Sequence, residues 1–499
     1  MSAWRCTLLV ATASSLTLAG CALKHPPFGA DIMPESARAQ IPGSWAGPHR
    51  SGIVVPNWIL TFHDPELTAL VTDAVERNPD LKAAAARVEA SRAAVRIAAA
   101  GLYPQVGIKA LGERQGQHIW GNLDRNINPP DFGSSGVENS GGAGIDTSVD
   151  ATSQRWVYGI GSGAAWEADV WGRIRSKKAA AKAESQALEA DYEFARQSLA
   201  AAVARAYFTT IEAAQQEANA QATLDIYTQY SKLTDIQKEH GFASDFEVAQ
   251  IKSRTASAQD ALYTAQQVRM QTIRAIEVVT SHYPAGRFDV RRSFPDQPRA
   301  VPAGLPAQIL ERRPDLIGSE RRFAAAFHRV NEARTARLPR FVLSATSGLG
   351  TAQLDGVGTL NAVLWTFAAG VTQPIFLGGE LQAAVDLRTA EQKAAAASYV
   401  GHALRAFGEV EDALANDYYL RQRENALGDA VSSSAQAMNL GGKQLDQGQI
   451  DMFTILRLTG ENLAAKVQLT QIRASRLRER VNLYLALGGD FEGTGAPGK

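Results

Sequence analysis

The chain has 499 residues with 51 basic and 51 acidic side chains, so its formal net charge is zero. A balanced chain gives no electrostatic case for nucleic acid as a partner. Hydrophobic residues make up 45% of the chain and aromatic residues only 7%, because alanine supplies much of the apolar share. Alanine-rich runs with charges between them suit long, closely packed helices better than the core of a compact enzyme.

Residues 1–20 have the pattern of a secretory signal peptide. Arg5 supplies a positive charge, and the apolar stretch over 8–19 is too short to span a membrane. The stretch ends in Leu-Ala-Gly-Cys, which matches the bacterial lipoprotein signal, so we expect Cys21 to carry lipid as the first mature residue. Ala22 follows, where an Asp would favour the inner membrane, so the outer membrane is favoured. The alternative is an ordinary signal peptide with a chance cysteine, although no later cysteine occurs.

The next part of the chain contains a helix-start motif that occurs twice. Residues 21–60 hold six prolines and no lasting period, which predicts an extended arm. A helical pattern then restarts at "RNPDL" (77–81), where Asn can cap and Pro suits the first helical position. The same motif recurs as "RRPDL" (312–316). In both copies a second proline follows 25 residues after the proline of the motif. Later segments correspond at an offset of 207, so the sequence predicts two repeats joined by a linker at 283–306.

Each half contains two predicted strands. In one of them Trp156, Tyr158 and Trp166 share a parity, and glycines and acidic residues occupy the other. One aromatic, apolar face and one small, polar face are typical of a membrane barrel with lipid outside and water inside. The alternative is a sheet with one face on a soluble core, but the lipoprotein signal and the long helices favour the membrane.

Very long helices are the strongest physical signal. No proline or glycine interrupts residues 174–240, which are 67 positions, and a helix of that length spans roughly 100 Å. Apolar residues step by 3 and 4 along the helix that follows, which predicts an antiparallel helical hairpin in each half. Polar members of this seam, such as Arg269, predict a shallow and partly wet contact.

Four strands per chain cannot close a wide barrel by themselves. Open sheet edges are not tolerated in hydrocarbon. Several chains must therefore share one barrel, and their long helices should pack side by side into a tube.

No catalytic, cofactor or metal site is predicted. None of the eight histidines pairs with another at metal-ligand spacing on a helix, and the chain has no HExxH, GxSxG or P-loop motif. "GIGSGA" (159–164) fits a dinucleotide fingerprint only formally, because it runs through an aromatic strand instead of opening a helix. We therefore predict that the protein is not an enzyme and uses no cofactor and no metal.

Several motifs together resemble a known family. They are "VPAGLPAQILERRPDLIGSE" (301–320), the duplicated "PDL" helix starts, "DVWGRIR" and the closing "NLYLALGG" (482–489). They resemble the TolC-like outer-membrane factors over about 58–489. More narrowly, they resemble the NodT-type lipoproteins that serve resistance-nodulation-division (RND) efflux pumps.

The resemblance implies a fold and a set of partners. The fold is mainly α with membrane β: a homotrimer with a shared twelve-stranded barrel in the outer membrane and a periplasmic tunnel of twelve helices. The implied partners are a periplasmic adaptor (membrane fusion) protein, an inner-membrane RND transporter and outer-membrane lipid, with no nucleic acid.

The resemblance also implies a periplasmic gate at the hairpin turn. In the family an Asp in an "LDAQ"-like segment commonly forms a constricting ring, but this chain has "FTILRLTG" (453–460), which puts Arg457 at that position. Asp451 is a second candidate, because a nearby carboxylate could pair with a ring of arginines. The alternatives are a helix cap for Asp451 and a solvated helix position for Arg457.

The sequence therefore favours a passive export duct for small molecules such as drugs or toxic compounds, in a tripartite RND-type pump. A type I protein-secretion duct and a periplasmic coiled-coil scaffold lipoprotein without a pore stay open as alternatives. The predicted organisation is a signal peptide (1–20), a lipid-anchored arm (21–60), a first repeat (61–282, strands about 104–112 and 156–171, hairpin 174–282), a linker (283–306), a second repeat (307–487, strands about 339–350 and 361–377, hairpin 380–487) and a flexible tail (488–499).

Overall fold

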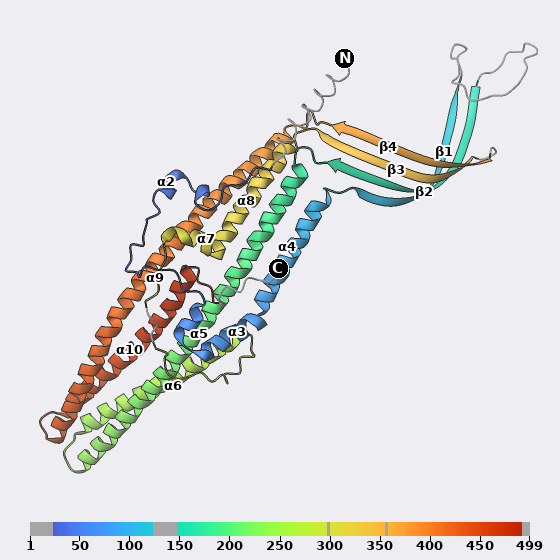
Figure 1. Ribbon diagram of the computed structural model, residues 1–499. Helices are drawn as coiled ribbons and strands as arrows, with labels where there is room; N and C mark the ends of the chain where they lie inside the picture. Colours follow the sequence, from blue (N-terminus) through green and yellow to red (C-terminus); the bar gives the residue numbers. More distant parts are fainter. Residues whose placement is uncertain (1–22, 123–147, 297–299, 355–357, 492–499) are drawn as a thin grey trace, which may run out of the picture. The chain divides into compact units, whose positions relative to one another are not determined.

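The computed structural model describes residues 23–122, 148–296, 300–354 and 358–491. The predicted signal peptide and Cys21 lie outside these ranges. The described chain is mainly helical, with one antiparallel sheet (Figure 1). Its residues form two compact units, one of which comprises the sheet and the helix ends next to it, within Arg96–Lys178 and Asn331–Val385.

The sheet has four strands in the order β1-β2-β3-β4, and all neighbours are antiparallel. Pairing between the first two strands continues without interruption from Gln105↔Ala165 to Asn122↔Ser148. The strand bounds are β1 Gln105–Asn122, β2 Ser148–Ala168, β3 Arg340–Leu354 and β4 Gly358–Thr372.

The strands differ in length from the prediction. β1 runs ten residues past the expected end at 112, and β2 begins eight residues before 156. The Gly, Gln and Ser residues there are weak strand formers, but ladder hydrogen bonds to the neighbouring strand hold them extended. β2 and β4 end sooner than expected, because Asp169 caps the following helix and Pro374 has no N–H for the ladder.

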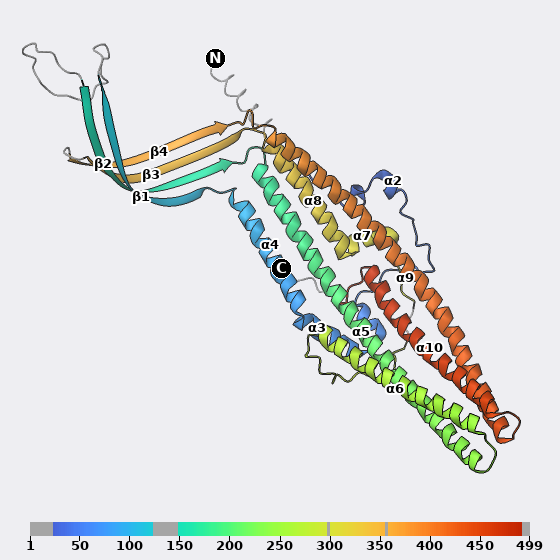
Figure 2. The same ribbon diagram turned by 180° about the vertical axis from the view of Figure 1, so that it is seen from behind.

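The helices of the two halves match in length. α4 (Pro79–Ala100) and α8 (Pro314–Thr335) each have 22 residues. α5 (Arg173–Glu239) and α9 (Glu380–Asp446) each have 67, and α6 (Asp245–Val279) and α10 (Met452–Ala486) each have 35. Both views show α6 alongside α5 and α10 alongside α9 (Figures 1 and 2). Equal lengths in the same order are what a duplicated unit predicts.

Local sequence explains where these helices start and turn. Asn78 accepts a hydrogen bond from the Leu81 N–H at 3.0 Å and so caps α4. Ser244 and Glu247 form a capping box at the start of α6. Gly241 and Gly448 have φ angles of +79° and +69°, which lets the chain reverse between the helices of each hairpin. Within the described ranges, no helix combines the length and the apolar character needed to cross a bilayer.

The contact within the α5–α6 hairpin combines apolar and polar positions, as predicted. Val248, Ile251 and Leu262 are buried along it. Arg269 occupies a seam position and forms an ion pair with Glu217 of α5 at 2.8 Å. A charge in the seam therefore has a partner across the hairpin.

The main core lies where the N-terminal segment meets α5, α9 and α10. Trp58 stacks on Tyr484 of α10, with the ring centroids 5.8 Å apart. The ring of Phe62 packs against that of Phe208 of α5, with the centroids 5.2 Å apart. This differs from the predicted extended arm, because Trp58–Phe62 forms a 3-10 helix with a buried aromatic side. The prolines do prevent long helices here, and the other short elements near the core are α2 (Glu35–Arg38), α3 (Pro65–Arg77) and α7 (Ile309–Arg312).

The start of the predicted flexible tail is also packed. The carbonyl of Asp490 accepts the Trp58 N–H at 3.1 Å, and Phe491 is buried. The rest of the predicted tail, from 492 on, lies outside the described residues. Burial of the apolar ring of Phe491 explains why the chain stays packed through Gly488, Gly489 and Asp490.

One carboxylate near the C-terminal end of α6 binds the predicted linker. Glu277 is buried and accepts the N–H groups of Gly286, Arg287 and Phe288 at 2.7, 2.9 and 3.2 Å. Burial alone raises the pKa of Glu277, but the three donors outweigh it and the pKa lies below its ordinary value.

We expect Glu277→Gln to loosen this part of the linker. Because the folded pKa is lowered, the stabilisation is complete above the ordinary carboxyl pKa and is lost as the pH falls through the lowered value. The amides of Gly286, Arg287 and Phe288 should exchange hydrogen faster in the variant at neutral pH, after correction for intrinsic rates. The same amides in the wild type should lose protection only in strongly acidic solution. Unchanged exchange in the variant would show that the carboxylate does not hold the linker.

Candidate functional site

The sheet has one face rich in large apolar side chains, which we call the apolar face. The register places residues of one parity from all four strands on it, for example Ile108, Ile160, Leu349 and Val363. Most of these side chains are exposed, and Trp365 and Phe367 of β4 reach 70% and 77%. An exposed apolar patch of this kind marks contact with a membrane or another protein.

The opposite face, which we call the glycine-rich face, carries few large side chains. Its centre is a stripe of glycines on β2 and β3: Gly159, Gly161, Gly163, Gly348 and Gly350. A Cβ on Gly161 would lie 3.0 Å from the carbonyl oxygen of Ser347, so the two strands approach too closely there for a larger residue. Lys109 and Glu113 of β1 also lie on this face. The face is thus small and polar, as the alternation predicted.

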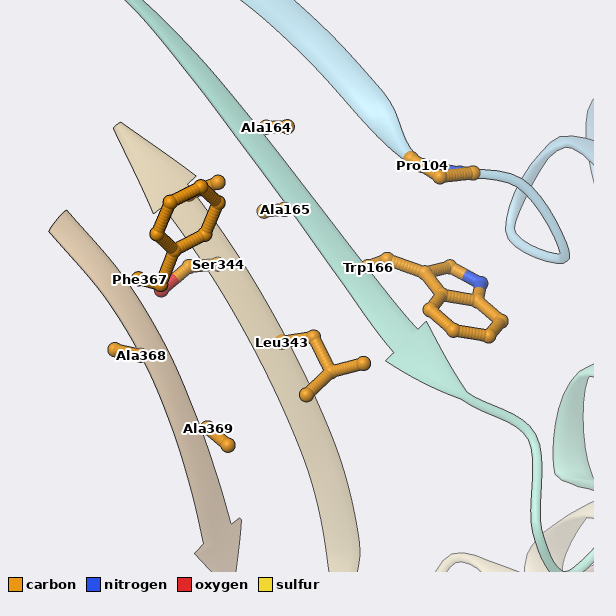
Figure 3. A pocket seen from close by; sticks show the side chains of 10 residues that line it. Pro104, Ala164, Ala165, Trp166, Leu343, Ser344, Phe367, Ala368 and Ala369 are labelled. Atoms are coloured by element: carbon orange, nitrogen blue, oxygen red, sulfur yellow. The ribbon is translucent and has the colours of Figure 1, made fainter. Parts of the chain in front are cut away.

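The apolar side chains leave a shallow hollow near the end of the sheet. Trp166, Leu343 and Ala369 are register partners across three strands, and Figure 3 shows them with Phe367 around the smaller alanines. The lining contains no ionisable side chain. The hollow therefore offers apolar contact and no acid–base chemistry.

Both edges of the sheet are without a strand partner in the described chain. β1 and β4 each pair on one side only. Edge strands of 18 and 15 residues present long rows of free N–H and C=O groups. In hydrocarbon, such edges would require another strand as partner.

The hairpin ends form a second candidate region, which we call the tip. A small apolar cluster joins the two hairpins there, with Tyr227 and Ile251 from one and Met452, Ile455 and Leu456 from the other. The rings of Phe246 and Phe453 also meet, with centroids 5.8 Å apart. The two turns are therefore held together as one body.

Both predicted gate residues lie at the tip. Asp451 is the N-cap of α10 and accepts the Thr454 N–H at 2.8 Å. Arg457 is exposed and forms an ion pair with Glu461, one turn further along α10, at 2.8 Å. The arginine is paired with Glu461 and not with Asp451, so the suggested pairing between the two candidates does not occur within the chain.

Two further residues at the tip have no counterpart in the prediction. Gln250 and Arg254 of α6 line a groove against Phe453, Arg457 and Glu461 of α10. The Gln250 side-chain oxygen is buried without a hydrogen-bond partner among the described atoms. This groove has no signature in the sequence, because it arises only when α6 and α10 pack together.

The cap and the charge of Asp451 can be tested separately. Hydrogen bonds from Thr454 lower the pKa of Asp451, so the cap is complete above the ordinary carboxyl pKa and is lost as the pH falls through the lowered value. Asp451→Asn keeps an oxygen for the Thr454 N–H, whereas Asp451→Ala removes it. We expect faster hydrogen exchange over 452–455 in the alanine variant than in the asparagine variant. Equal exchange in both would mean that the cap does not order this turn.

The described residues were also considered as possible metal ligands. Within the described ranges, no group of three or more His, Cys, Asp and Glu side chains could hold a metal ion. Long helical hairpins, an apolar sheet face and open sheet edges together define a protein of the outer-membrane channel class.

The comparison with protein families gives the particular group. The model of the outer membrane efflux protein family matches residues 70–280 and 305–489. The chain belongs to the outer membrane efflux protein family. The match is interrupted at the linker between the two halves. Members of this family are transport ducts of the outer membrane and not enzymes.

Individual relatives agree. The chain is 30% identical over 501 residues to the antibiotic efflux pump outer membrane protein ArpC of Pseudomonas putida, covering 98% of this chain and 97% of the relative. It is 29% identical over 495 residues to the toluene efflux pump outer membrane protein TtgF of the same species, covering 97% of each.

Solved structures share the fold. The outer-membrane channel OprN superimposes with a TM-score of 0.77 at 25% identity, covering 95% of this chain and 99% of that one. The open state of the MtrE channel of Neisseria gonorrhoeae gives 0.76 at 24% identity, covering 95% and 100%. The chain is therefore an outer-membrane efflux component with the TolC-like fold, as the sequence predicted.

Proposed function

We propose that three copies of this chain form one outer-membrane export duct. The apolar face between two unpaired edge strands carries this proposal. In a trimer, β1 of one copy pairs with β4 of the next, and twelve strands close one barrel. The apolar face then contacts lipid and the glycine-rich face lines the water-filled passage.

The duct serves a tripartite pump of the RND type. A periplasmic adaptor binds the tip, and an inner-membrane transporter supplies the energy. The names of the relatives support small, partly apolar cargo, since they refer to antibiotics and toluene. A type I protein-secretion duct and a scaffold without a pore are the remaining alternatives. The scaffold leaves the exposed apolar face without a role.

Conductance and mass test the proposal together. Purified protein should give a native mass of three times the chain mass, which is 53.5 kDa before processing, and should open pores in planar lipid bilayers. A monomer without pores would overturn the proposal. Loss of drug efflux in a strain that lacks this gene, restored when the gene is supplied again, separates drug export from protein secretion.

A lipid on Cys21 is part of the proposal. The supporting observation is the Leu-Ala-Gly-Cys sequence, and three chains would bring three anchors to one assembly. Intact-mass measurement of the mature protein tests it, since an unmodified Cys21 would exclude the anchor.

Arg457 is proposed to contribute to the periplasmic gate. Three exposed arginines around a narrow opening would favour anions, and Glu461 beside each of them limits their repulsion. In single-channel recordings, Arg457→Ala should raise the open probability and reduce anion preference. An unchanged closed state together with unchanged ion selectivity would remove Arg457 from the gate.

A further inference from the structure

The connection from β4 to α9 displays large apolar side chains in a fixed conformation. Ile375 and Phe376 are 90% and 84% exposed. The Gln373 side-chain amide donates to the carbonyl of Arg337 at 2.9 Å, which fixes the start of the connection. Gly378 and Gly379, with φ angles of +58° and +87°, turn the chain into α9.

The corresponding position in the first half shows that helix formation does not require this exposure. α5 and α9 begin at Arg173 and Glu380, an offset of 207, so Asp169 corresponds to Phe376. Asp169 accepts the N–H groups of Ile174 and Arg175, each at 2.9 Å, and caps α5. Phe376 has no such task, which leaves its exposed ring unexplained by the fold.

Basic residues lie beside the exposed apolar ones. The Trp171 indole donates to the carbonyl of Pro339 at 2.9 Å, so the connection from α8 to β3 lies against Trp171. Arg334 in the last turn of α8 and Arg337 in that connection are exposed and form no ion pair with any residue that the structure describes. We call this surface the basal collar: Trp171, Arg334, Arg337, Leu338, Ile375 and Phe376.

We propose that the basal collar binds anionic phospholipid headgroups in the membrane leaflet on the helical side. This inference rests on the proposed function, in which the apolar face contacts lipid. The collar continues that face past Val371, its last residue on β4, which ends at Thr372. Apolar and aromatic side chains at such a border enter the interface, and arginines beside them bind lipid phosphate. Two arginines without acidic partners favour an anionic headgroup over a zwitterionic one.

Spin labels can measure the depth of the collar in vesicles of phosphatidylethanolamine and phosphatidylglycerol. The full chain, with Cys6 and Cys21 replaced by serine, carries one nitroxide through Phe376→Cys, Ile160→Cys or Phe242→Cys. We expect oxygen to reach the label at 160, on the apolar face, and a water-soluble nickel reagent to reach the label at 242, at the tip. The label at 376 should lie between them, at headgroup depth.

The three labels distinguish failure of this inference from failure of the duct. If the label at 160 lies in hydrocarbon but the label at 376 is fully water-accessible, the collar does not bind lipid and the duct stands. A label at 376 that neither reagent reaches indicates burial against a second copy and also overturns the inference. A label at 160 in water contradicts the proposed function itself.

Lipid retention tests the charge requirement. Native mass spectrometry of the purified protein should show preferential retention of phosphatidylglycerol over phosphatidylethanolamine. The double variant Arg334→Gln/Arg337→Gln should weaken phosphatidylglycerol retention roughly 10- to 30-fold, since each interfacial arginine contributes about 1 kcal/mol. Arg87→Gln/Arg423→Gln is the matched control, because both arginines are exposed on helices elsewhere. Equal retention of both lipids by the wild type, or equal loss in both double variants, would overturn the proposal.

Discussion

Trp365→Lys is expected to prevent assembly of the protein in the outer membrane. Trp365 lies at the middle of β4 and on the apolar face, opposite Ser347 of β3. A lysine at the bilayer midplane of a barrel costs about 2–4 kcal/mol per copy, and a trimer carries three copies. The amount of assembled protein in the outer-membrane fraction, and the extent of folding into vesicles, should both fall sharply.

The neighbouring position provides the control. Thr366→Lys adds the same charge one residue further on, where the side chain lies on the glycine-rich face. This variant should assemble normally and shift the ion selectivity of the pore toward anions. Equal assembly of the two variants would contradict the assignment of the faces, because only the face distinguishes the two positions.

Asp64→Ala should cause the largest loss of stability in the helical part. Asp64 is buried and accepts from the Tyr207 hydroxyl at 3.0 Å and from Arg291 at 3.1 Å. The same side chain caps α3 through the N–H groups of Glu66 and Leu67. Burial, together with this carboxylate, raises the pKa of Tyr207, so the hydroxyl stays a donor at neutral pH.

Removing this acceptor affects three elements at once. We expect a loss of about 2–4 kcal/mol, because a broken buried pair and a lost helix cap add up while Arg291 stays partly solvated. Denaturant unfolding in detergent, followed by the helical circular dichroism signal, measures it. Asp73→Ala in α3 is the control, because its pair with Arg77 is largely exposed, its second contact, with His282, is long at 3.7 Å, and such pairs contribute about 0–1 kcal/mol. A similar loss of unfolding free energy in both variants would mean that Asp64 contributes no more than an exposed acidic residue.

The fold could be predicted from the sequence wherever local chemistry decides it. Glycines mark the start and end of α5, and the repeat offset carries the same bounds to α9 although five glycines lie within that helix. The parity of Trp156, Tyr158 and Trp166 gives the two faces of the sheet. The predicted end of β1 and the predicted start of β2 were wrong, because pairing between the two strands overrides weak strand propensity. The burial of Trp58 was missed for a related reason, since a proline-rich segment shows no period even where tertiary contacts bury it.

The candidate site also contains residues that local sequence indicates and residues that only the packing of helices reveals. The turn motif predicts Asp451 and Arg457 as gate candidates, and this stays a prediction. The ion pair between Arg457 and Glu461 depends on their i,i+4 spacing on α10, which the motif does not include. Gln250 and Arg254 could not be recognised, because their groove depends on how two helices from different halves pack. Phe376 was assigned to the end of a strand, and only its accessibility and its comparison with Asp169 mark it as unusual.

The glycine stripe limits how the proposed passage can be tuned. At the level of Gly161 and Gly348, the part of the wall formed by β2 and β3 has no side chains, so its position depends on strand number and tilt. A Cβ on Gly161 would lie 3.0 Å from the carbonyl oxygen of Ser347, so a larger residue cannot be placed there without moving β3. The side chains that can change the bore at this level therefore belong to the two edge strands, Lys109 on β1 and Leu364 on β4. In the proposed trimer these strands meet at the boundary between copies, so substitutions that alter the width act at that boundary.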